Sequence, residues 1–271
     1  MGCFCVRKFT KYSYNQTILK VFGCGDHKKI KVITMSCLRN KGVEDDTEVF
    51  TVRGSVNDEK TDESISRTRS AIFELAFCNP WDWFFTATLD PKKYDRTDLK
   101  KFHKDLTQWL RDYNKKYKLH IKFLLIPELH SDGKSWHMHG FLYGLPVEHL
   151  HQFKVGDKMG FKLAQKVANG DLVYNWCSYM DKFGFCDLEP IRNSEAVSKY
   201  VTKYISKNLR NSVKDLNAHM YYCSRGLNRA ETIKVGIMSA HITPTFTGDY
   251  CSVAWFDFDE DLLKSLADSI I

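Results

Sequence analysis

Two histidines near the middle of the chain have a spacing suited to metal binding. His137 and His139 stand two residues apart in the sequence Trp-His-Met-His-Gly. If this segment is a β-strand, both imidazoles point to one face of the sheet, because successive strand side chains alternate. A His-x-His pair alone is a weak signal, since many such histidines are solvated or packed. This pair lies in an otherwise apolar segment, where unpaired imidazoles are costly to bury, so a bound ligand is the favoured interpretation.

A glutamate upstream of the pair is the candidate third ligand. Residues 122–129 and 135–143 are rich in apolar residues and flank a Ser-Asp-Gly turn signal, which predicts a β-hairpin. If the loop runs from residue 130 to residue 135, Glu128 lies directly across from His137. The carboxylate and the two imidazoles then converge on a position for a divalent cation. A slip of one residue would turn the glutamate to the other face.

Two tyrosines in the last third of the chain form a second candidate group. Residues 194–207 begin with a capping serine and carry apolar residues at helical spacing, so Tyr200 and Tyr204 would project from one face of a helix. Tyrosine is a poor nucleophile at its usual pKa near 10, so a catalytic tyrosine needs a cation or a metal-bound phosphate nearby. Lys203 is such a cation. The alternative is an ordinary half-buried aromatic pair beside a basic face, and it would be preferred if the pair stood alone.

The elements that must position these residues are predicted by periodicity and composition. The clearest is a helix over residues 97–117, whose apolar stripe lies opposite a row of lysines. Residues 81–90 are aromatic and rich in threonine, which predicts a strand buried on both faces. We expect further helices over residues 65–76, 147–153 and 174–183, a strand over 185–191, loop or short elements over 161–170, and a turn over 221–229 that presents Arg225.

The domain organisation follows from shifts in composition. Residues 1–63 are predicted to form a few short strands followed, from residue 40, by a polar loop or linker. Residues 64–230 are the expected main domain, and residues 231–271 an extension of strands with a terminal helix. A chain of 271 residues with 43% hydrophobic residues is long enough for one domain of about 180 to 200 residues with an appended part.

Composition also limits the location and the partners. No apolar run approaches the roughly 18 residues of a membrane span, and no signal peptide is recognisable, so we expect a protein of the cytoplasm without a membrane partner. Nine cysteines, scattered and odd in number, favour reduced thiols over a disulfide framework. A net charge of +7 is compatible with a polyanionic partner such as nucleic acid.

Three short motifs, taken together and in this order, resemble those of a known superfamily. They are a Phe-x-Thr-x-Thr strand at Phe84 to Thr88, a His-hydrophobe-His-Gly strand at His137, and Tyr-x-x-Lys-Tyr in a helix at Tyr200. The order resembles that of the HUH endonucleases that initiate rolling-circle replication. It is most similar to the two-tyrosine group found in single-stranded DNA phages and related plasmids. The resemblance covers about residues 65 to 230, and Ala87 stands where the family usually has Leu.

The resemblance implies a role for each of these residues. His137, His139 and Glu128 would hold Mg²⁺ or Mn²⁺. Tyr200 and Tyr204 would cleave single-stranded DNA, one of them forming a 5′-phosphotyrosine link and leaving a free 3′-OH, with help from Lys203 at the phosphate. The residues expected to contact DNA are Thr86, Thr88, Lys199, Lys207 and Arg225. The implied fold is α+β, with a central antiparallel sheet flanked by helices, as in the RRM/ferredoxin-like palm, and with the histidine strand in its middle.

The implied function is that of a rolling-circle replication initiator acting at a single-stranded origin in a bacterial cytoplasm, beside a host helicase and polymerase. Three alternatives remain open. A transposase or a conjugative relaxase would use the same chemistry, although the chain has no room for a helicase. An origin-binding protein without catalysis would need neither the histidines nor the tyrosines. A metal-dependent hydrolase that uses water would leave the tyrosines without a role.

Overall fold

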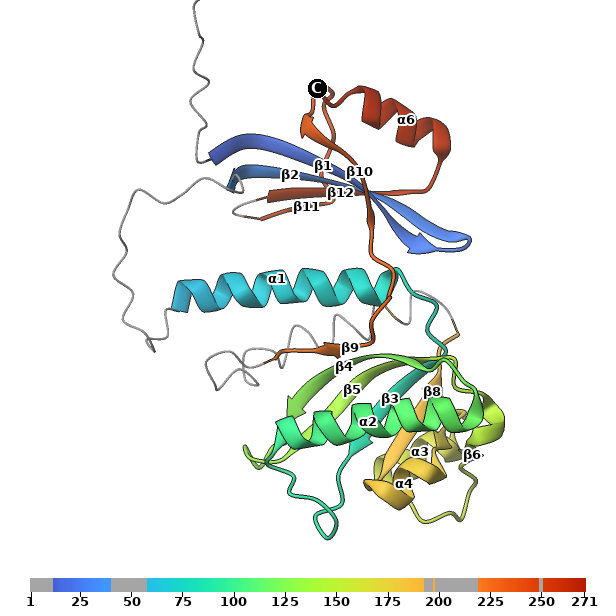
Figure 1. Ribbon diagram of the computed structural model, residues 1–271. Helices are drawn as coiled ribbons and strands as arrows, with labels where there is room; N and C mark the ends of the chain where they lie inside the picture. Colours follow the sequence, from blue (N-terminus) through green and yellow to red (C-terminus); the bar gives the residue numbers. More distant parts are fainter. Residues whose placement is uncertain (1–11, 40–57, 193–196, 198–218, 249–250) are drawn as a thin grey trace, which may run out of the picture. The chain divides into compact units, whose positions relative to one another are not determined.

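The structure is a computed structural model that describes residues 12–39, 58–192, 197, 219–248 and 251–271. The chain divides into two compact units: Val56–Asn228 forms the larger, and Met1–Ser55 together with Arg229–Ile271 forms the smaller. Each unit is built on an antiparallel sheet; among the described residues, several helices accompany the sheet of the larger unit and one accompanies that of the smaller (Figure 1). The predicted α+β class with a central antiparallel sheet is therefore confirmed.

The sheet of the larger unit places the histidine strand in its interior. Among the described residues the strand order is β6-β7-β8-β3-β5-β4-β9, and neighbouring strands are antiparallel. The histidine strand β5 lies between β3 and β4, as expected. The strands are β3 (Trp83–Thr88), β4 (Lys122–Leu129), β5 (Trp136–Tyr143), β6 (His151–Gln152), β7 (Tyr174–Asn175), β8 (Cys186–Pro190) and β9 (Tyr222–Cys223).

Helices cover both faces of this sheet (Figure 1). On one face, α2 (Leu99–Tyr117) and α4 (Cys177–Lys182) pack on the core that includes Phe85, Leu125 and Met138. On the other face, α1 (Asp58–Phe77) packs on a second cluster that includes Ile126 and Phe141. The described part of this unit also contains η1 (Val147–His149) and α3 (Phe161–Ala168).

The long helix α2 forms where the sequence predicts it. Its N-terminus is capped by Asp98, whose side chain accepts a hydrogen bond of 2.9 Å from the backbone N–H of Lys101. Its C-terminus is closed by Lys118 in the left-handed conformation, at φ 55°. The predicted apolar stripe supplies the buried residues Phe102, Leu106, Leu110 and Tyr113.

The predicted hairpin is present with the expected loop and register. The backbone N–H of His130 donates to the carbonyl oxygen of Ser135 at 2.7 Å, which closes the loop at those two residues. Inside the loop, Asp132 accepts from the backbone N–H groups of Lys134 and Ser135, both at 2.8 Å. Glu128 consequently pairs with His137, as the spacing predicted.

Gly140, directly after the second histidine, allows β4 and β5 to approach closely. A Cβ at this position would lie 1.9 Å from the carbonyl oxygen of Leu124 on the neighbouring strand. We expect Gly140→Ala to push the two strands apart, to lower the free energy of unfolding by about 1 to 3 kcal/mol in a urea titration, and to weaken Mn²⁺ binding. Gly160→Ala is the control, because its Cβ would meet no atom within 4 Å. An unchanged urea midpoint for Gly140→Ala would show that the strands tolerate the methyl group.

Several boundaries differ from the predictions. Helix α1 begins at Asp58, inside the predicted linker. The strand over residues 81–90 is fully buried on one face only, because Phe84, Thr86 and Thr88 lie on the partly open face. Residues 161–168 form a helix where loop or short elements were expected. The helix expected over 147–153 is a 3₁₀ turn followed by a short strand. The helix expected over 174–183 begins only at Cys177, after the short strand β7.

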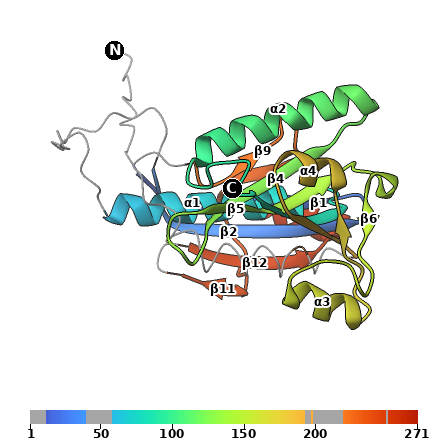
Figure 2. The same ribbon diagram turned by 90° about the horizontal axis from the view of Figure 1, so that it is seen from below.

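The smaller unit joins the two ends of the chain in one sheet. Its strand order is β10-β1-β2-β12-β11 in the part that the structure describes. Figure 2 shows β2, β12 and β11 side by side. Its first two strands are long and form one hairpin, which corrects the prediction of a few short strands. Helix α6 packs on one face over Leu19, Ile30 and Val32. The elements are β1 (Tyr12–Cys24), β2 (His27–Arg39), β10 (Glu231–Ile237), β11 (Phe246–Thr247), β12 (Cys251–Asp257) and α6 (Glu260–Asp268).

None of the helices among the described residues is both long enough and apolar enough to cross a membrane.

Candidate metal centre

Two imidazoles and one carboxylate converge on the face of the sheet that α1 also packs against. The Nε2 atom of His139 lies 2.9 Å from Oε2 of Glu128, and Nε2 of His137 lies 3.4 Å from the same oxygen. The centroids of the two imidazole rings are 4.5 Å apart. All three residues come from the hairpin, so the cluster depends on one strand pairing and its register.

The side chains of the cluster are mostly buried but keep some exposure to solvent. The side chains of His139, His137 and Glu128 are exposed by 10%, 18% and 21%. Burial raises the pKa of Glu128, but the hydrogen bonds and the charges of the two histidines outweigh this effect and hold the pKa at about 2. The carboxylate is therefore ionised at any pH at which the histidines bind a metal.

The cluster fits a divalent cation. Its ligand atoms all lie within 4.8 Å of one another. Neighbouring ligands of an octahedral ion with bonds of about 2.1 Å stand roughly 3 Å apart, which is close to the two measured separations. Two nitrogens and one oxygen suit a first-row ion such as Mn²⁺, and three protein ligands leave positions for a substrate oxygen and water.

The neighbouring strand β3 carries two of the predicted DNA-contact residues on the same face. Thr86 pairs with His139 and Thr88 pairs with His137 across the ladder between β3 and β5. The Thr86 hydroxyl lies 3.3 Å from Nδ1 of His139, on the side of the ring opposite Glu128. Thr86 and Thr88 therefore both lie beside the cluster, and the Thr86 hydroxyl is within hydrogen-bonding distance of the candidate metal ligand His139.

Sequence reasoning missed an acidic residue behind this group. Asp187 on β8 lies directly across from Thr86 in the ladder between β3 and β8. Burial raises the pKa of Asp187 to about 6. In the sequence, Asp187 is one acidic residue in an alternating strand, and only the pairing of β3 with β8 reveals its neighbours.

Of the other predicted site residues, Arg225 lies away from the cluster and the rest fall outside the described residues. The predicted turn is present, with Arg225 exposed beside Gly226 at φ 71°. It lies near the opposite end of β4 from Glu128, because the Lys122 ammonium donates to the carbonyl oxygen of Gly226 at 2.8 Å. Five predicted residues lie outside the described residues: Tyr200, Tyr204, Lys203, Lys199 and Lys207.

The described residues on either side of the tyrosines pack on the metal-bearing face. Val197, 6% exposed, belongs to the same apolar cluster as Ile126 and Phe141. Each of those two stands two positions along its strand from Glu128 or His139 and shares its face. After the tyrosines, β9 pairs with β4 in the antiparallel direction, so the chain enters β9 from the Glu128 end of β4.

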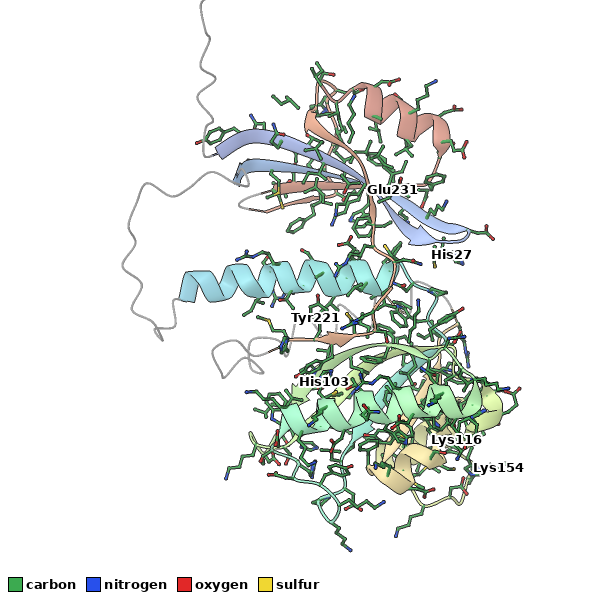
Figure 3. All side chains as sticks on the ribbon, in the orientation of Figure 1. His27, His103, Lys116, Lys154, Tyr221 and Glu231 are labelled. Carbon is green, nitrogen blue, oxygen red and sulfur yellow. The ribbon has the colours of Figure 1, made fainter. Side chains whose placement is uncertain are left out.

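Strand β9 is also held from the other face of the sheet. The ring of Tyr222 stacks on the imidazole of His103 with centroids 3.7 Å apart and planes inclined by 15°. Figure 3 shows His103 on α2 and Tyr221 beside β9. Tyr221 itself packs against the cluster that contains Val197. Both ends of the stretch that contains the tyrosines are therefore attached to the larger unit.

Comparison with known protein families shows that part of the chain matches a family model. The family model described as replication-associated protein ORF2/G2P matches residues 82–209, just under half of the chain. No curated protein and no solved structure matches the chain. The matched residues span β3, the hairpin with the metal-ligand cluster, and both candidate tyrosines. This part of the chain is similar to the replication-associated proteins of that family, and the match supports a rolling-circle replication initiator type.

Proposed function

We propose that this protein is a rolling-circle replication initiator that cleaves and rejoins single-stranded DNA at an origin through a tyrosine. The observation that carries the proposal is the convergence of His137, His139 and Glu128 on one sheltered point of the sheet. The family match to replication-associated proteins supports the biological role.

The proposed reaction is a transesterification. The phenolate oxygen of Tyr200 or Tyr204 attacks the phosphorus atom, the bond from phosphorus to the 3′-oxygen breaks, and the 3′-oxygen takes up a proton to become the 3′-OH. The phenol proton passes to solvent, and the 5′-phosphate stays on the tyrosine. Rejoining is the reverse attack by a 3′-OH. When Mg²⁺ or Mn²⁺ is bound, it supplies a Lewis acid that polarises a phosphate oxygen.

The chain's own residues supply position and charge. His137, His139 and Glu128 would hold the ion, and Lys203 would stabilise the phenolate of the adjacent tyrosine. Tyr200 is three residues from Val197, a separation that the chain spans in at most about 11 Å. Because Val197 packs on the metal-bearing face, this short distance supports a tyrosine acting at the cluster.

The remaining predicted residues are proposed to hold the DNA. Thr88 lies on the open face beside His137, and Arg225 extends from an exposed turn at the far end of β4. Lys199 and Lys207, which flank the tyrosines in sequence, would contact backbone phosphates.

Binding to single-stranded DNA is expected to weaken steeply with salt. Each phosphate neutralised on a single strand contributes about 0.7 to the slope of log affinity against log salt. Lys199→Ala and Lys207→Ala should each reduce the slope by about 0.7 in fluorescence anisotropy titrations. Lys116→Ala is the control, because Lys116 lies on α2, over the opposite face of the sheet (Figure 3). Equal slopes for all three variants and the wild type would assign these two lysines to a solvated surface.

A labelled oligonucleotide tests the proposed function. The protein is incubated with single-stranded DNA and Mn²⁺, and the products are separated in SDS with the label at either end of the strand. We expect an SDS-resistant adduct that carries the label on the 3′ side of the cut, and a released fragment with a free 3′-OH. Cleavage without an adduct would indicate a hydrolase that uses water, and binding without cleavage would indicate an origin-binding protein.

A transposase or relaxase would pass the same adduct test, so the biological role needs a second one. A plasmid that carries the cognate origin should replicate as circles and release single-stranded circles when this chain is present. Host helicase and polymerase are the proposed partners in that reaction. Transfer of DNA ends to a different target molecule would favour the transposase.

A further inference from the structure

An aromatic residue stands two strands away from the histidines of the metal-ligand cluster. Phe185 directly precedes β8, and its carbonyl oxygen accepts a hydrogen bond of 2.9 Å from the backbone N–H of Thr88. This bond extends the ladder between β3 and β8 by one residue. Thr88 in turn pairs with His137 on β5, so the three residues form one row across the sheet. Because neighbouring strands lie about 4.8 Å apart, the backbone of Phe185 is roughly 10 Å from that of His137.

Phe185 is exposed on the same face of the sheet as the metal ligands. Its neighbour Cys186 is buried in the core on which α2 packs, and side chains alternate along a strand, so Phe185 points to the opposite, metal-bearing face. Its ring stacks beside that of Phe153, with centroids 6.2 Å apart and planes inclined by 28°. Phe153 is 6% exposed and Phe185 is 37% exposed. A buried phenylalanine therefore supports one whose surface stays open.

A basic segment, residues 154–166, is attached beside Phe185. It begins directly after Phe153, and it includes the first part of α3. At its other end, Lys166 contacts Glu189 at 2.6 Å, and Glu189 stands on the same strand and face as Phe185. The segment has four exposed lysines at intervals of four against one carboxylate: Lys154, Lys158, Lys162 and Lys166, with Asp157.

Lysines beside an open aromatic surface suit single-stranded nucleic acid. Cations hold the phosphate backbone, and unpaired bases stack on aromatic rings whatever their sequence. Duplex DNA keeps its bases stacked inside the helix, so it has no free base to place on the ring. A single strand is thus the polyanion that uses both the ring and the lysines.

We propose that a base of the single-stranded substrate stacks on Phe185 and that Lys162 holds a neighbouring phosphate. The proposal rests on the proposed function, because it concerns the strand that is cleaved at the metal. Lys166 is already paired with Glu189, and Lys162 stands one helical turn earlier, about 6 Å along the axis of α3.

The distance to the histidines limits where the stacked base lies along the strand. The roughly 10 Å between the backbones of Phe185 and His137 corresponds to about three nucleotides at the 3.4 Å rise of a stacked strand. In a more extended strand it corresponds to fewer. The stacked base therefore lies within about three nucleotides of the cleaved phosphate.

Affinity for a single-stranded oligonucleotide that the protein cleaves tests the proposal. It is measured by fluorescence anisotropy in EDTA, where no cleavage is expected. Stacking of one base is worth about 5- to 150-fold in affinity, so Phe185→Leu, which keeps an apolar contact with Phe153, should weaken binding by at least about fivefold. Phe185→Trp keeps an aromatic face and should bind at least as tightly as the wild type.

Tyr117→Leu is the matched control for the loss of the ring. Tyr117 is 39% exposed and the Lys116 ammonium lies 4.9 Å from its ring centroid, so it has the same combination of ring and lysine. It belongs to α2, however, which packs on the opposite face of the sheet. Its affinity should stay within about twofold of the wild type.

Abasic nucleotides locate the stacked base. Each position on either side of the cut is replaced in turn by a nucleotide that lacks its base. At one position within about three nucleotides of the cut, the wild type should lose at least as much affinity as Phe185→Leu does. The two losses should not add, because both changes remove the same contact. The absence of any position whose effect depends on Phe185 would contradict the proposal.

The role of Lys162 is tested by the salt dependence of binding. Lys162→Ala should reduce the slope of log affinity against log salt by about 0.7, as expected for one phosphate on a single strand. Lys116→Ala should leave the slope unchanged. An unchanged slope for Lys162→Ala as well would overturn the role given to this lysine.

Further measurements separate base stacking from other roles of the ring. Without DNA, Phe185→Leu should bind Mn²⁺ within about twofold of the wild type and should sediment as the wild type does. A loss of Mn²⁺ affinity would assign the ring to packing of the sheet, and a changed oligomeric state would assign it to contact between copies of the chain. Either result, or an unchanged affinity for DNA, would overturn the proposal. If no oligonucleotide is cleaved but binding of oligo(dT) still depends on Phe185, the proposed function fails while the stacking surface stands.

Discussion

Replacing His137 and His139 together by alanine should reduce cleavage of single-stranded DNA by at least about 1,000-fold. A metal that acts as a Lewis acid supplies several kcal/mol of transition-state stabilisation, and each 1.4 kcal/mol or so is a factor of ten in rate. The two imidazoles provide two of the three ligand atoms of the cluster, so the double variant should lose most of its affinity for the ion. Removal of metal by EDTA should have the same effect on the wild type, and added Mn²⁺ should reverse it.

The hairpin itself offers a matched control for the histidine variants. His130 is exposed in the loop, and its ring centroid is 5.2 Å from that of His137, yet it is not part of the ligand cluster. His130→Ala should therefore cleave within about twofold of the wild type. Circular dichroism and thermal melting check that each variant is folded. Undiminished cleavage by the double alanine variant, or full activity in EDTA, would show that cleavage does not depend on a metal ion held by these histidines.

Replacing Tyr200 and Tyr204 together by phenylalanine should abolish the covalent adduct altogether. Phenylalanine keeps the aromatic ring but lacks the nucleophilic oxygen, so stability should change little while the chemistry is lost. If the two tyrosines lie one helical turn apart, both can reach the same phosphate. Each single variant should then retain some adduct formation, in unequal amounts.

The single tyrosine variants also test the second half of the cycle. Joining that is coupled to a second cleavage requires a second nucleophile, so it should fail in both single variants even where the first cleavage survives. Tyr221→Phe is the control, because Tyr221 lies beside β9 at the end of the same stretch (Figure 3). It should leave both reactions unchanged.

The metal-ligand cluster could be predicted from the sequence because it depends on local structure. One hairpin supplies all three ligands, and a short loop with Asp132 and Gly133 fixes its register. Alternation along a strand then determines which side chains meet. The long helix α2 was predictable for the same reason, since its apolar stripe and its capping residue Asp98 are read within a single segment.

The parts that depend on distant pairings could not be predicted. Asp187 meets Thr86 only because β8 pairs with β3, and about a hundred residues separate the two in sequence. The smaller unit joins β1 and β2 to β10 and β12 from the other end of the chain, a pairing that no local pattern indicates. Strand β3 was expected to be buried on both faces because aromatic residues dominate its composition. One of its faces is instead only partly buried, and that face carries Thr86 and Thr88 beside the metal-ligand cluster.

Peptide mapping of the covalent adduct is the most direct test of the central claim, which joins the metal cluster to a tyrosine nucleophile. The adduct is formed with Mn²⁺ on a short single-stranded oligonucleotide, digested with trypsin and nuclease, and sequenced by mass spectrometry. We predict that the remaining nucleotide is found on Tyr200 or Tyr204, and that none is found when His137 and His139 are alanine. A nucleotide on any other residue, or an adduct that forms without the two histidines, would contradict the account.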